Sequence, residues 1–411
     1  MATGYDFKTY LSSVDPKNSY DIEPLQGGLV NYTVRAKKTS KSHRGIFRRH
    51  KSLILKQAPD FVAAAGPSLP FSKERQKVEA AALQVLDPSG PLGHVGENEM
   101  VITPTLIRHD EDNSVIVMKD LEENMGPLIT LWDFLKNPQG SRDHVALICG
   151  VLGRRTGSFL AKLHRKVVRG IILGTYGAGL SNPLAHTFTR SLVRDAAVDT
   201  LQERIATVNA EAAKHLADRV AADFDRENME FESCFGIGDF HPGSILVAPW
   251  MPKHSFPYPL AVMGWEFATS DGRGVNGDLA HFLAPLHLLA LSTDVDSLCS
   301  VATRTFIDQM TTAYSKVTTR VVSRDPKSPE VRQDLALLRS ALIMHGREII
   351  NQAVEKDWAR EDDFTKEMIS LGAWYLERAG DSVSNMVEEE NWTLLQSGED
   401  QGKLLSVFTF C

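Results

Sequence analysis

Short apolar runs in the first third of the chain predict β-strands. Five segments either alternate between apolar and polar residues or stay apolar, and Gly27 and Gly28 lie near the end of the first. Residues 71–86 instead place apolar side chains at helical spacing, and Ser72 is suited to cap the start of this helix. We expect strands over residues 21–29, 31–37, 52–57, 101–107 and 114–118.

After about Leu121 the pattern changes to the period of amphipathic helices. Long helices are expected over residues 143–164, 196–224, 279–291, 302–316 and 331–355. A small sheet-rich part followed by a larger helical part predicts an α+β fold of two lobes. We place the N-terminal lobe at residues 1–120 and the C-terminal lobe at residues 121–411.

Composition and charge argue against several kinds of partner. The net charge is -7, so electrostatics give no reason to expect nucleic acid. The four cysteines are far apart, which argues against a disulfide framework or a thiolate metal site. The N-terminus does not resemble a secretory signal, and the longest apolar stretch, residues 281–291, is too short to cross a bilayer. We therefore expect a cytoplasmic protein without membrane contact. The sequence does not predict its oligomeric state.

Candidate phosphate-binding residues lie in the strand-rich part. Phosphoryl transfer needs a cradle for the phosphates, a cation, magnesium, and an acidic group near the attacking hydroxyl. Gly27 and Gly28, followed by Asn31, let the backbone approach a triphosphate closely, although the same segment also fits a hairpin turn. Lys56 closes an apolar strand, where a purely structural lysine is unusual. We predict that Lys56 forms an ion pair with Glu79 on the following helix.

The segment GIGDFHPGSILV, residues 236–247, carries the strongest signal for catalysis. Turn-forming residues hold Asp239 and His241 just before an apolar strand, where a carboxylate can orient a hydroxyl or accept its proton. Ser244 offers an oxygen to magnesium. The next apolar strand leads to Glu266, a second candidate oxygen ligand, although a lone acid at a strand end is also common on protein surfaces.

Taken in order, these segments resemble the aminoglycoside phosphotransferase superfamily, in particular methylthioribose kinase and its fungal relatives. The resemblance runs from about Leu25 to Leu289 and is carried by QGGLVN, LILKQAP, ERQKVEAAAL, VMKDL, GSFLAKLH, GDFHPGSILV, AVMGWEFA and GDLAHFLAPLHLL. It implies a two-lobed fold like that of protein kinases, with ATP and Mg²⁺ as cofactors. The implied reaction is phosphate transfer to an alcohol group of a small-molecule substrate.

The resemblance also implies roles for individual residues. Lys56 would bind the phosphates with Glu79 as its partner, and Asp239 would be the catalytic aspartate. Ser244 and Glu266 would lie on the metal side. Three further roles are implied: adenine would be received by backbone groups of the hinge, Met118, Lys119, Asp120 and Leu121; Asp278 would brace the loop of Asp239; and Arg347 would contact the substrate.

Two positions depart from the family pattern. Ile237 replaces the usual histidine two residues before Asp239, and Gly264 replaces the first acid of the D-x-E metal motif. Glycine has no side chain to hold magnesium. Gly264 ends an apolar strand, and residues two apart in an extended chain point to the same side. An aspartate at this position is therefore expected to reach the same ion as Glu266.

Three hypotheses follow from this pattern. The first is an ATP-dependent phosphotransferase that acts on a hydroxyl of a small metabolite, in a specialised-metabolite pathway for example. The second is a kinase-like enzyme that has been turned to non-phosphoryl chemistry, with Asp239 and His241 as its acid–base pair. The third is a catalytically inactive protein that still binds a nucleotide or metabolite. Binding of magnesium and ATP separates the first hypothesis from the other two.

Overall fold

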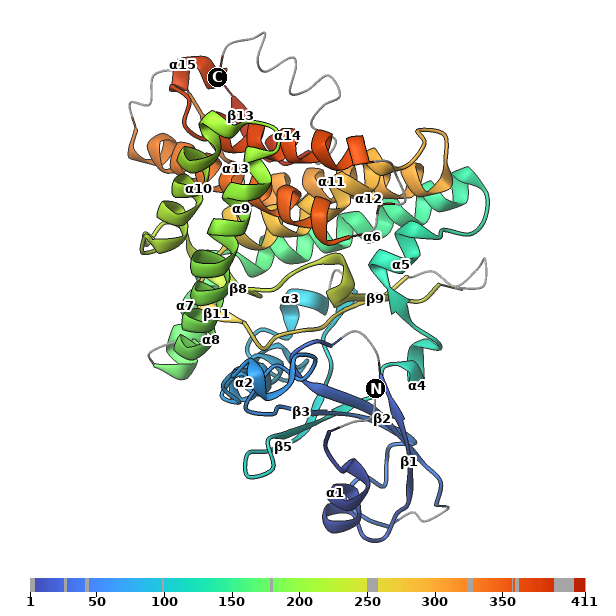
Figure 1. Cartoon of the computed structure of the whole chain (residues 1–411). Coiled ribbons are helices and arrows are strands. Elements are labelled where there is room, and N and C mark those ends of the chain that lie inside the picture. The colour runs from blue at the N-terminus through green and yellow to red at the C-terminus, as the bar shows by residue number, and fades with distance from the viewer. Residues whose placement is uncertain are drawn as a thin grey trace.

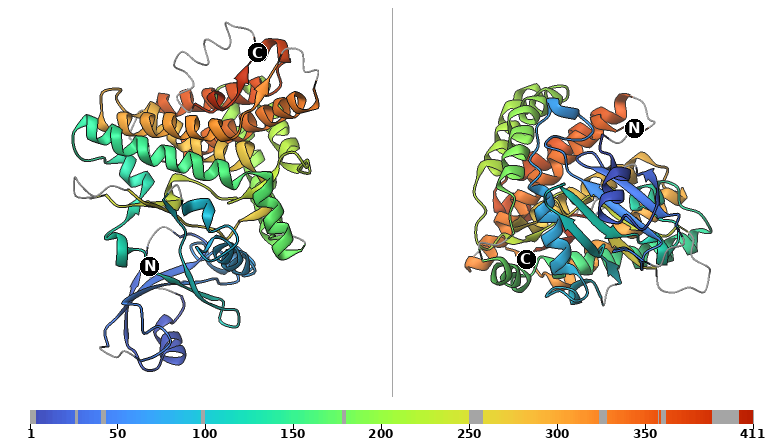
Figure 2. Two further views of the ribbon diagram at one scale, coloured as in Figure 1. Left: turned by 180° about the vertical axis from the view of Figure 1, so that it is seen from behind. Right: turned by 90° about the horizontal axis from the view of Figure 1, so that it is seen from below.

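The architecture is that of a computed structural model (Figure 1). It describes residues 4–25, 28–40, 44–97, 100–177, 180–249, 258–323, 328–356, 358, 362–387 and 403–410. A small sheet lobe lies at one end of the molecule, and a larger helical lobe lies at the other (Figures 1 and 2). The predicted α+β organisation is confirmed.

The N-terminal lobe is built on a five-stranded antiparallel sheet with the order β1-β2-β3-β6-β5. Its central strand β3 is buried along its whole length, as expected for a strand that is covered on both faces. Helix α1 (Phe7–Val14) packs against one face through Phe7, Tyr10 and Leu11. The strands are β1 (Tyr20–Pro24), β2 (Tyr32–Lys38), β3 (Ser52–Gln57), β5 (Leu106–Asp110) and β6 (Val115–Lys119).

The strand expected over residues 101–107 is wrong. It is two strands in different sheets, β4 (Val101–Ile102) and β5, and β4 pairs with β10 of the C-terminal lobe. Pro104 lies between them, and proline lacks the N–H group that a continuous ladder requires. The first lobe therefore contributes a strand to the second.

Helix α2 (Arg75–Leu86) begins later than expected, and Ser72 does not cap it. The residue at its N-cap is Glu74, which makes no side-chain capping bond. Ser72 instead accepts a hydrogen bond from the Glu74 N–H within the preceding turn, at 3.2 Å. The helix turns Glu79 inward toward β3, where this carboxylate is buried.

Long helices stack across the C-terminal lobe (Figure 1). Helix α12 packs on α6, and α13 lies between α11 and α14. Their side chains form the main hydrophobic core. Within it the rings of Phe240 and Phe282 stack with their centroids 4.5 Å apart. These helices are α6 (Arg142–Leu163), α11 (Ala280–Ser292), α12 (Leu298–Val317), α13 (Pro329–Glu355) and α14 (Asp362–Arg378).

The single helix expected over residues 196–224 is two helices. Helix α9 (Ala197–Ala206) ends, and α10 (Ala210–Asp225) begins after Asn209, whose side chain accepts from the Ala212 N–H at 3.1 Å. An asparagine cap of this kind starts a new helix. The other helices are α3 (His94–Glu97), α4 (Glu122–Met125), α5 (Leu131–Lys136), α7 (Lys166–Tyr176), α8 (Pro183–Arg190) and α15 (Val383–Val387).

Small sheets in the C-terminal lobe hold the loop of the predicted catalytic residues. This loop, residues 237–244, joins β8 to β9 and is called the Asp239 loop below. Strand β8 pairs with β11, and β9 pairs with β10 and β7. No helix within the described ranges is both long and apolar enough to cross a membrane. The strands are β7 (Ile129–Thr130), β8 (Ser233–Gly236), β9 (Ile245–Val247), β10 (Leu260–Val262), β11 (Thr269–Arg273), β12 (Val321–Val322) and β13 (Thr409–Phe410).

Candidate active site

A buried cluster of charges connects the two lobes. Lys56 on β3 donates to Glu79 Oε1 of α2 at 2.9 Å, so the predicted ion pair is confirmed. The same ammonium group lies 3.1 Å from both carboxylate oxygens of Glu266, which follows β10 in the other lobe. Sequence reasoning did not predict this second pair. One lysine thus holds two carboxylates from opposite lobes.

Arg75, at the start of α2, fixes the segment that precedes β2. Its side chain is fully buried, and its guanidinium donates to Asn31 Oδ1 at 3.0 Å and to the Val30 carbonyl at 2.8 Å. Asn31 in turn donates to Glu266 Oε1 at 3.3 Å. The Asn31 side chain is therefore part of the charge cluster. Gly28 precedes this segment, and Gly27, the other predicted cradle residue, lies outside the described residues.

The two carboxylates of the cluster have opposite pKa shifts. Burial raises the pKa of Glu79 to about 7, although Lys56 opposes the increase. Burial also favours the neutral form of Glu266, but Lys56, a backbone hydrogen bond and Arg75 together outweigh it and lower the pKa of Glu266. Burial disfavours the charged form of Lys56 as well, yet Glu266 and Glu79 together raise its pKa. Glu266 is thus the carboxylate that stays ionised near neutral pH.

Replacing Glu79 by glutamine is expected to change how stability depends on pH. Because the folded-state pKa of Glu79 lies above its ordinary 4.5, its contribution to stability is present below 4.5 and is lost as the pH rises through about 7. Glu79→Gln removes this loss. Relative to the wild type, the free energy of unfolding of the variant should therefore rise between pH 5 and pH 8, on the order of 2 kcal/mol.

Urea denaturation at several pH values measures this difference. Glu203→Gln is the matched control and should follow the wild type, because Glu203 is exposed on α9 and makes no hydrogen bond or ion pair with the described residues. A difference between Glu79→Gln and wild type that stays constant, or falls, from pH 5 to pH 8 would show that the pKa of Glu79 is not raised.

The Asp239 loop is held from behind by Asp278. This buried carboxylate accepts from the N–H groups of Ile237 and Gly238 at 2.7 and 2.9 Å, as expected for a bracing residue. His164 contacts its Oδ2 at 3.2 Å. Gly238 has a φ of 87°, and a Cβ there would lie 2.4 Å from the Phe267 carbonyl oxygen, so this turn requires glycine.

Asp278 holds the loop so that Asp239 faces solvent, and the residues after Asp239 form a tight turn. The Asp239 side chain is exposed. His241 Nδ1 accepts from the Gly243 N–H at 3.1 Å. Burial lowers the pKa of His241, which Asp239 opposes, so the imidazole is biased toward its neutral form. Ser244 Oγ donates to the His241 carbonyl at 2.7 Å and accepts from its N–H at 3.2 Å, which leaves one lone pair for a metal.

Gly264 does not lie in an extended strand, contrary to expectation. Strand β10 ends at Val262, and Gly264 has a φ of 76°. A side chain placed at position 264 would nevertheless lie near Glu266, as expected, although the extended backbone is not the reason. A Cβ at this position would lie 3.8 Å from both Glu266 Oε2 and Ser244 Cβ, in ordinary contact. Position 264 thus faces both candidate metal ligands.

The described residues include no group of three or more His, Cys, Asp or Glu side chains placed to hold a metal ion. The available donors are the free lone pair of Ser244 and the Glu266 carboxylate, which Lys56 already contacts. Magnesium commonly binds one or two protein carboxylates and takes its remaining oxygens from phosphates and water. This donor set fits that kind of magnesium, bound together with a nucleotide.

The predicted hinge residues lie at the end of β6, the strand beside β3: Met118 and Lys119 are its last two residues, and Asp120 and Leu121 follow it. Met118 is buried in the sheet, where it pairs with Ile54 of β3. The Asp120 side chain is structural, because it accepts from Arg35 Nε at 2.8 Å and from Ser52 Oγ at 2.6 Å. The Asp120 side chain is therefore engaged within the protein, and its carbonyl accepts from the Glu123 N–H at 3.3 Å. Adenine recognition by the backbone of these residues stays a prediction.

Arg347 is not part of the charge cluster. It lies on α13, where it pairs with Glu348, and Glu348 also lies 3.7 Å from His281. His281 is close enough to His241 to lower its pKa, after the larger effect of burial. Arg347 is thus connected to the Asp239 loop through two residues that sequence reasoning missed.

A lysine between two tryptophans lies near the same part of the loop. The Lys356 ammonium is 3.8 Å from the ring centroid of Trp132 and 6.0 Å from that of Trp358. Burial, together with Lys136, lowers the pKa of Lys356 to about 8. Trp132 lies on α5, which packs on the turn Pro242–Ser244. No sequence motif distinguished these residues from ordinary core and surface positions.

Known proteins with a similar sequence include small-molecule kinases. The chain is 26% identical over 250 residues to a methylthioribose kinase of Bacillus thuringiensis (strain Al Hakam), and 27% identical over 252 residues to one from a strain of Bacillus cereus. The chain resembles methylthioribose kinase. The match spans 59% of this chain and only 57% of each relative, less than two thirds of their length. The resemblance expected from the sequence motifs is confirmed.

Other comparisons add less. No family model matches the chain. A GDP complex of a mutant aminoglycoside 2'-phosphotransferase-IIIa covers 91% of this chain and 96% of its own, at a TM-score of 0.42 and 14% identity. A choline kinase from Cryptosporidium parvum covers 94% of this chain and 94% of its own, at a TM-score of 0.39 and 13% identity. At these scores the structural similarity supports no further conclusion.

Proposed function

We propose that the protein is an ATP-dependent phosphotransferase that acts on a hydroxyl group of a small molecule. The observation that carries the proposal is the Lys56–Glu79–Glu266 cluster, which joins the two lobes beside the Asp239 loop. A buried lysine held by a helix carboxylate is the arrangement that positions a cation on ATP phosphates. The similarity to methylthioribose kinases supports the same reaction class.

In this proposal one lobe binds the nucleotide and the other binds the acceptor. Residues 1–120 bind the nucleotide, with Lys56 on the phosphates and the backbone after Met118 facing adenine. Residues 121–411 carry Asp239 and the acceptor site, to which Arg347 belongs. His281, Glu348 and Lys356 extend this acceptor side, because they link Arg347 and Trp132 to His241.

The proposed reaction transfers the γ-phosphoryl group. Asp239 accepts a hydrogen bond from the acceptor hydroxyl and takes its proton as the new O–P bond forms. The bond between the γ-phosphorus and the bridging β,γ-oxygen breaks, and ADP leaves. Lys56 stabilises the charge on the phosphate oxygens. Magnesium, held by Ser244 and Glu266, would neutralise phosphate charge.

Magnesium–ATP binding tests the proposal directly. The wild type is expected to bind ATP in calorimetry, more tightly with Mg²⁺ than without it. Lys56→Met should weaken ATP binding about tenfold or more, because the loss of one charge-assisted contact costs about 1.5–3 kcal/mol. Lys8→Met, at an exposed position of α1, is the matched control and should bind like the wild type.

Two other results would favour the alternatives. ATP binding that is insensitive to both Mg²⁺ and Lys56→Met would indicate a nucleotide-binding protein without transferase activity. A folded wild type that binds no nucleotide at all would favour a site turned to other chemistry, for which Gly264 in place of a metal-binding acid is the motivation.

A further inference from the structure

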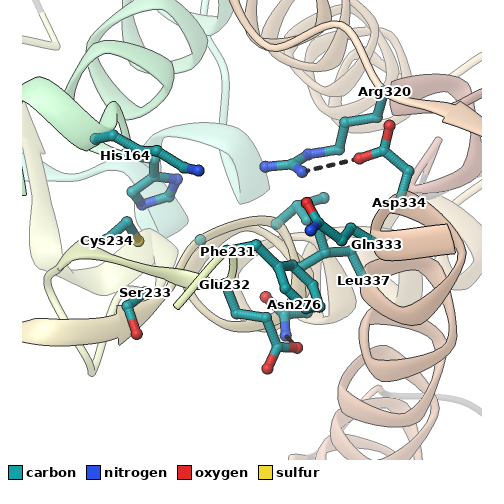
Figure 3. A pocket seen from close by; sticks show the side chains of 13 residues that line it. His164, Phe231, Glu232, Ser233, Cys234, Asn276, Arg320, Gln333, Asp334 and Leu337 are labelled. Carbon is teal, nitrogen blue, oxygen red and sulfur yellow. Dashed lines mark hydrogen bonds and ion pairs between the residues drawn. The ribbon is translucent and has the colours of Figure 1, made fainter. Parts of the chain in front are cut away.

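A cavity of about 170 Å³ lies beside the residues that brace the Asp239 loop (Figure 3). This is far more than the roughly 10–15 Å³ that a single water molecule needs. Its lining is mostly polar. Figure 3 shows the Arg320 side chain extending over the cavity, with its partner Asp334 on one side and His164 on the other. The lining also includes Lys166, Cys234 and Asn276.

Asn276 presents an unmatched hydrogen-bond acceptor in this cavity. Its side chain is fully buried, and its Nδ2 donates to Glu232 Oε1 at 3.2 Å and to Ser340 Oγ at 3.1 Å. A carboxylate such as Glu232 only accepts, so the orientation of the amide is fixed. Asn276 Oδ1 has no partner among the described residues. A buried carbonyl oxygen of this kind calls for a donor from a ligand.

The cationic groups of the cavity present unmatched donors. Arg320 Nη1 lies 3.3 Å from Asp334 Oδ1, but Arg320 Nε is buried without a partner among the described residues. Asp334 also accepts from the Val321 N–H at 2.8 Å. Lys166, exposed at the edge, forms no ion pair within the part of the chain that is described. Glu232 is neutralised by two contacts with Arg226. The cavity therefore suits an anion.

The lining is connected to the Asp239 loop along two routes. The Tyr314 hydroxyl, which interacts with Arg320, lies 2.9 Å from His164 Nδ1, and His164 Nε2 lies 3.2 Å from Asp278 Oδ2. Asn276 also lies two residues before Asp278 in the same short π-helix, Gly274–Leu279. Asp278 holds the N–H groups of Ile237 and Gly238.

We propose that this cavity binds a small oxyanion that retains an acidic proton, namely inorganic hydrogenphosphate, and that its occupancy steadies the Asp239 loop. The phosphate oxygens accept from Arg320 Nε and Lys166, as guanidinium and ammonium groups commonly donate to phosphate. The remaining P–OH group donates to Asn276 Oδ1. This site is separate from the nucleotide site and does not depend on the proposed reaction.

Sulfate is the discriminating probe, because it has the shape of phosphate but carries no proton at neutral pH. Calorimetry at pH 7 and constant ionic strength should show phosphate binding about tenfold or more tightly than sulfate, since sulfate leaves Asn276 Oδ1 unmatched. Methyl phosphate, which adds a methyl group, separates free phosphate from phosphate monoesters. Hydrogen exchange at Ile237 and Gly238 should slow when phosphate is added.

Variants locate the site. Arg320→Gln and Lys166→Gln should each weaken phosphate binding, Arg320→Gln by about tenfold or more. Lys8→Gln should leave it unchanged. Lys166 is exposed, so its variant keeps the test valid if Arg320→Gln proves unstable by circular dichroism. ATP binding by these variants should be retained, which separates this site from the proposed function.

Several outcomes would overturn the proposal. Equal affinity for phosphate and sulfate would remove the role of Asn276. Phosphate binding that survives Arg320→Gln and Lys166→Gln but is lost in Lys56→Met would place the anion in the nucleotide site. Tighter binding of methyl phosphate than phosphate would assign the site to monoesters. The absence of any binding heat and of any change in hydrogen exchange would mean that the cavity holds only water.

Discussion

Asp239→Ala is expected to lower the rate of phosphate transfer by about 100- to 10,000-fold, the usual effect of removing a general base. Stability should change little. The carboxylate is exposed and makes no hydrogen bond or ion pair within the described residues. The fold around it depends on Asp278 and Gly238, which the substitution leaves in place. The free energy of unfolding should therefore stay within about 0.5 kcal/mol of wild type.

The measurement is single-turnover kinetics with ATP and an accepted alcohol, together with urea denaturation of both proteins. Asp112→Ala, at another exposed aspartate, in the turn between β5 and β6, is the matched control and should keep full activity. Asp239→Asn keeps the shape but cannot take a proton, so it should be nearly as slow as the alanine variant. Near-normal turnover by Asp239→Ala would remove this residue from the mechanism.

Local signals predicted the parts of the site that are local in sequence. Lys56 lies at the end of a continuous apolar strand, and Glu79 lies on the inward face of the next helix, so their pairing follows from a strand and a helix adjacent in the chain. The bracing role of Asp278 followed from the family motif instead. No periodicity distinguishes this aspartate from a surface residue.

The parts that could not be predicted depend on contacts between distant segments. Glu266 meets Lys56 across 210 positions, and this requires the relative placement of the two lobes. Arg75 has the sequence context of an exposed residue in the first turn of a helix, yet it is fully buried, with carbonyl oxygens satisfying its guanidinium. The break at Asn209 and the division of β4 from β5 at Pro104 were visible as a capping residue and a proline. In both cases a continuous apolar pattern masked the local signal.

Gly264→Asp is expected to increase the magnesium-dependent affinity for ATP by about 10- to 100-fold, similar in size to the loss that follows removal of an outer-shell partner at a metal site. The new Cβ would lie 3.8 Å from Glu266 Oε2 and from Ser244 Cβ, so its carboxylate faces both candidate ligands. A second carboxylate supplies the charge and the hard oxygen that magnesium favours. It would also compensate for Glu266, which now divides its oxygens between Lys56 and Asn31.

The backbone opposes this gain only modestly. Gly264 has a φ of 76°, where an ordinary side chain costs roughly 1–2 kcal/mol, but aspartate and asparagine tolerate this region better than other residues. Gly264→Asn is therefore the matched control, because it has the same shape and backbone cost without the charge. A gain in magnesium-dependent affinity for aspartate but not for asparagine would show that the missing acid limits metal binding.

The opposite result is equally informative. If the site does not bind magnesium, the new carboxylate faces Glu266 as an unpaired like charge, and repulsion raises the pKa of one of the two acids. Gly264→Asp would then be less stable than Gly264→Asn at pH 8, and the difference would shrink as the pH falls and one carboxylate is protonated. Magnesium would not restore the stability. That pattern, in a variant still folded by circular dichroism and with no gain in ATP binding, would exclude a weakened kinase and leave a pocket whose chemistry no longer uses the metal.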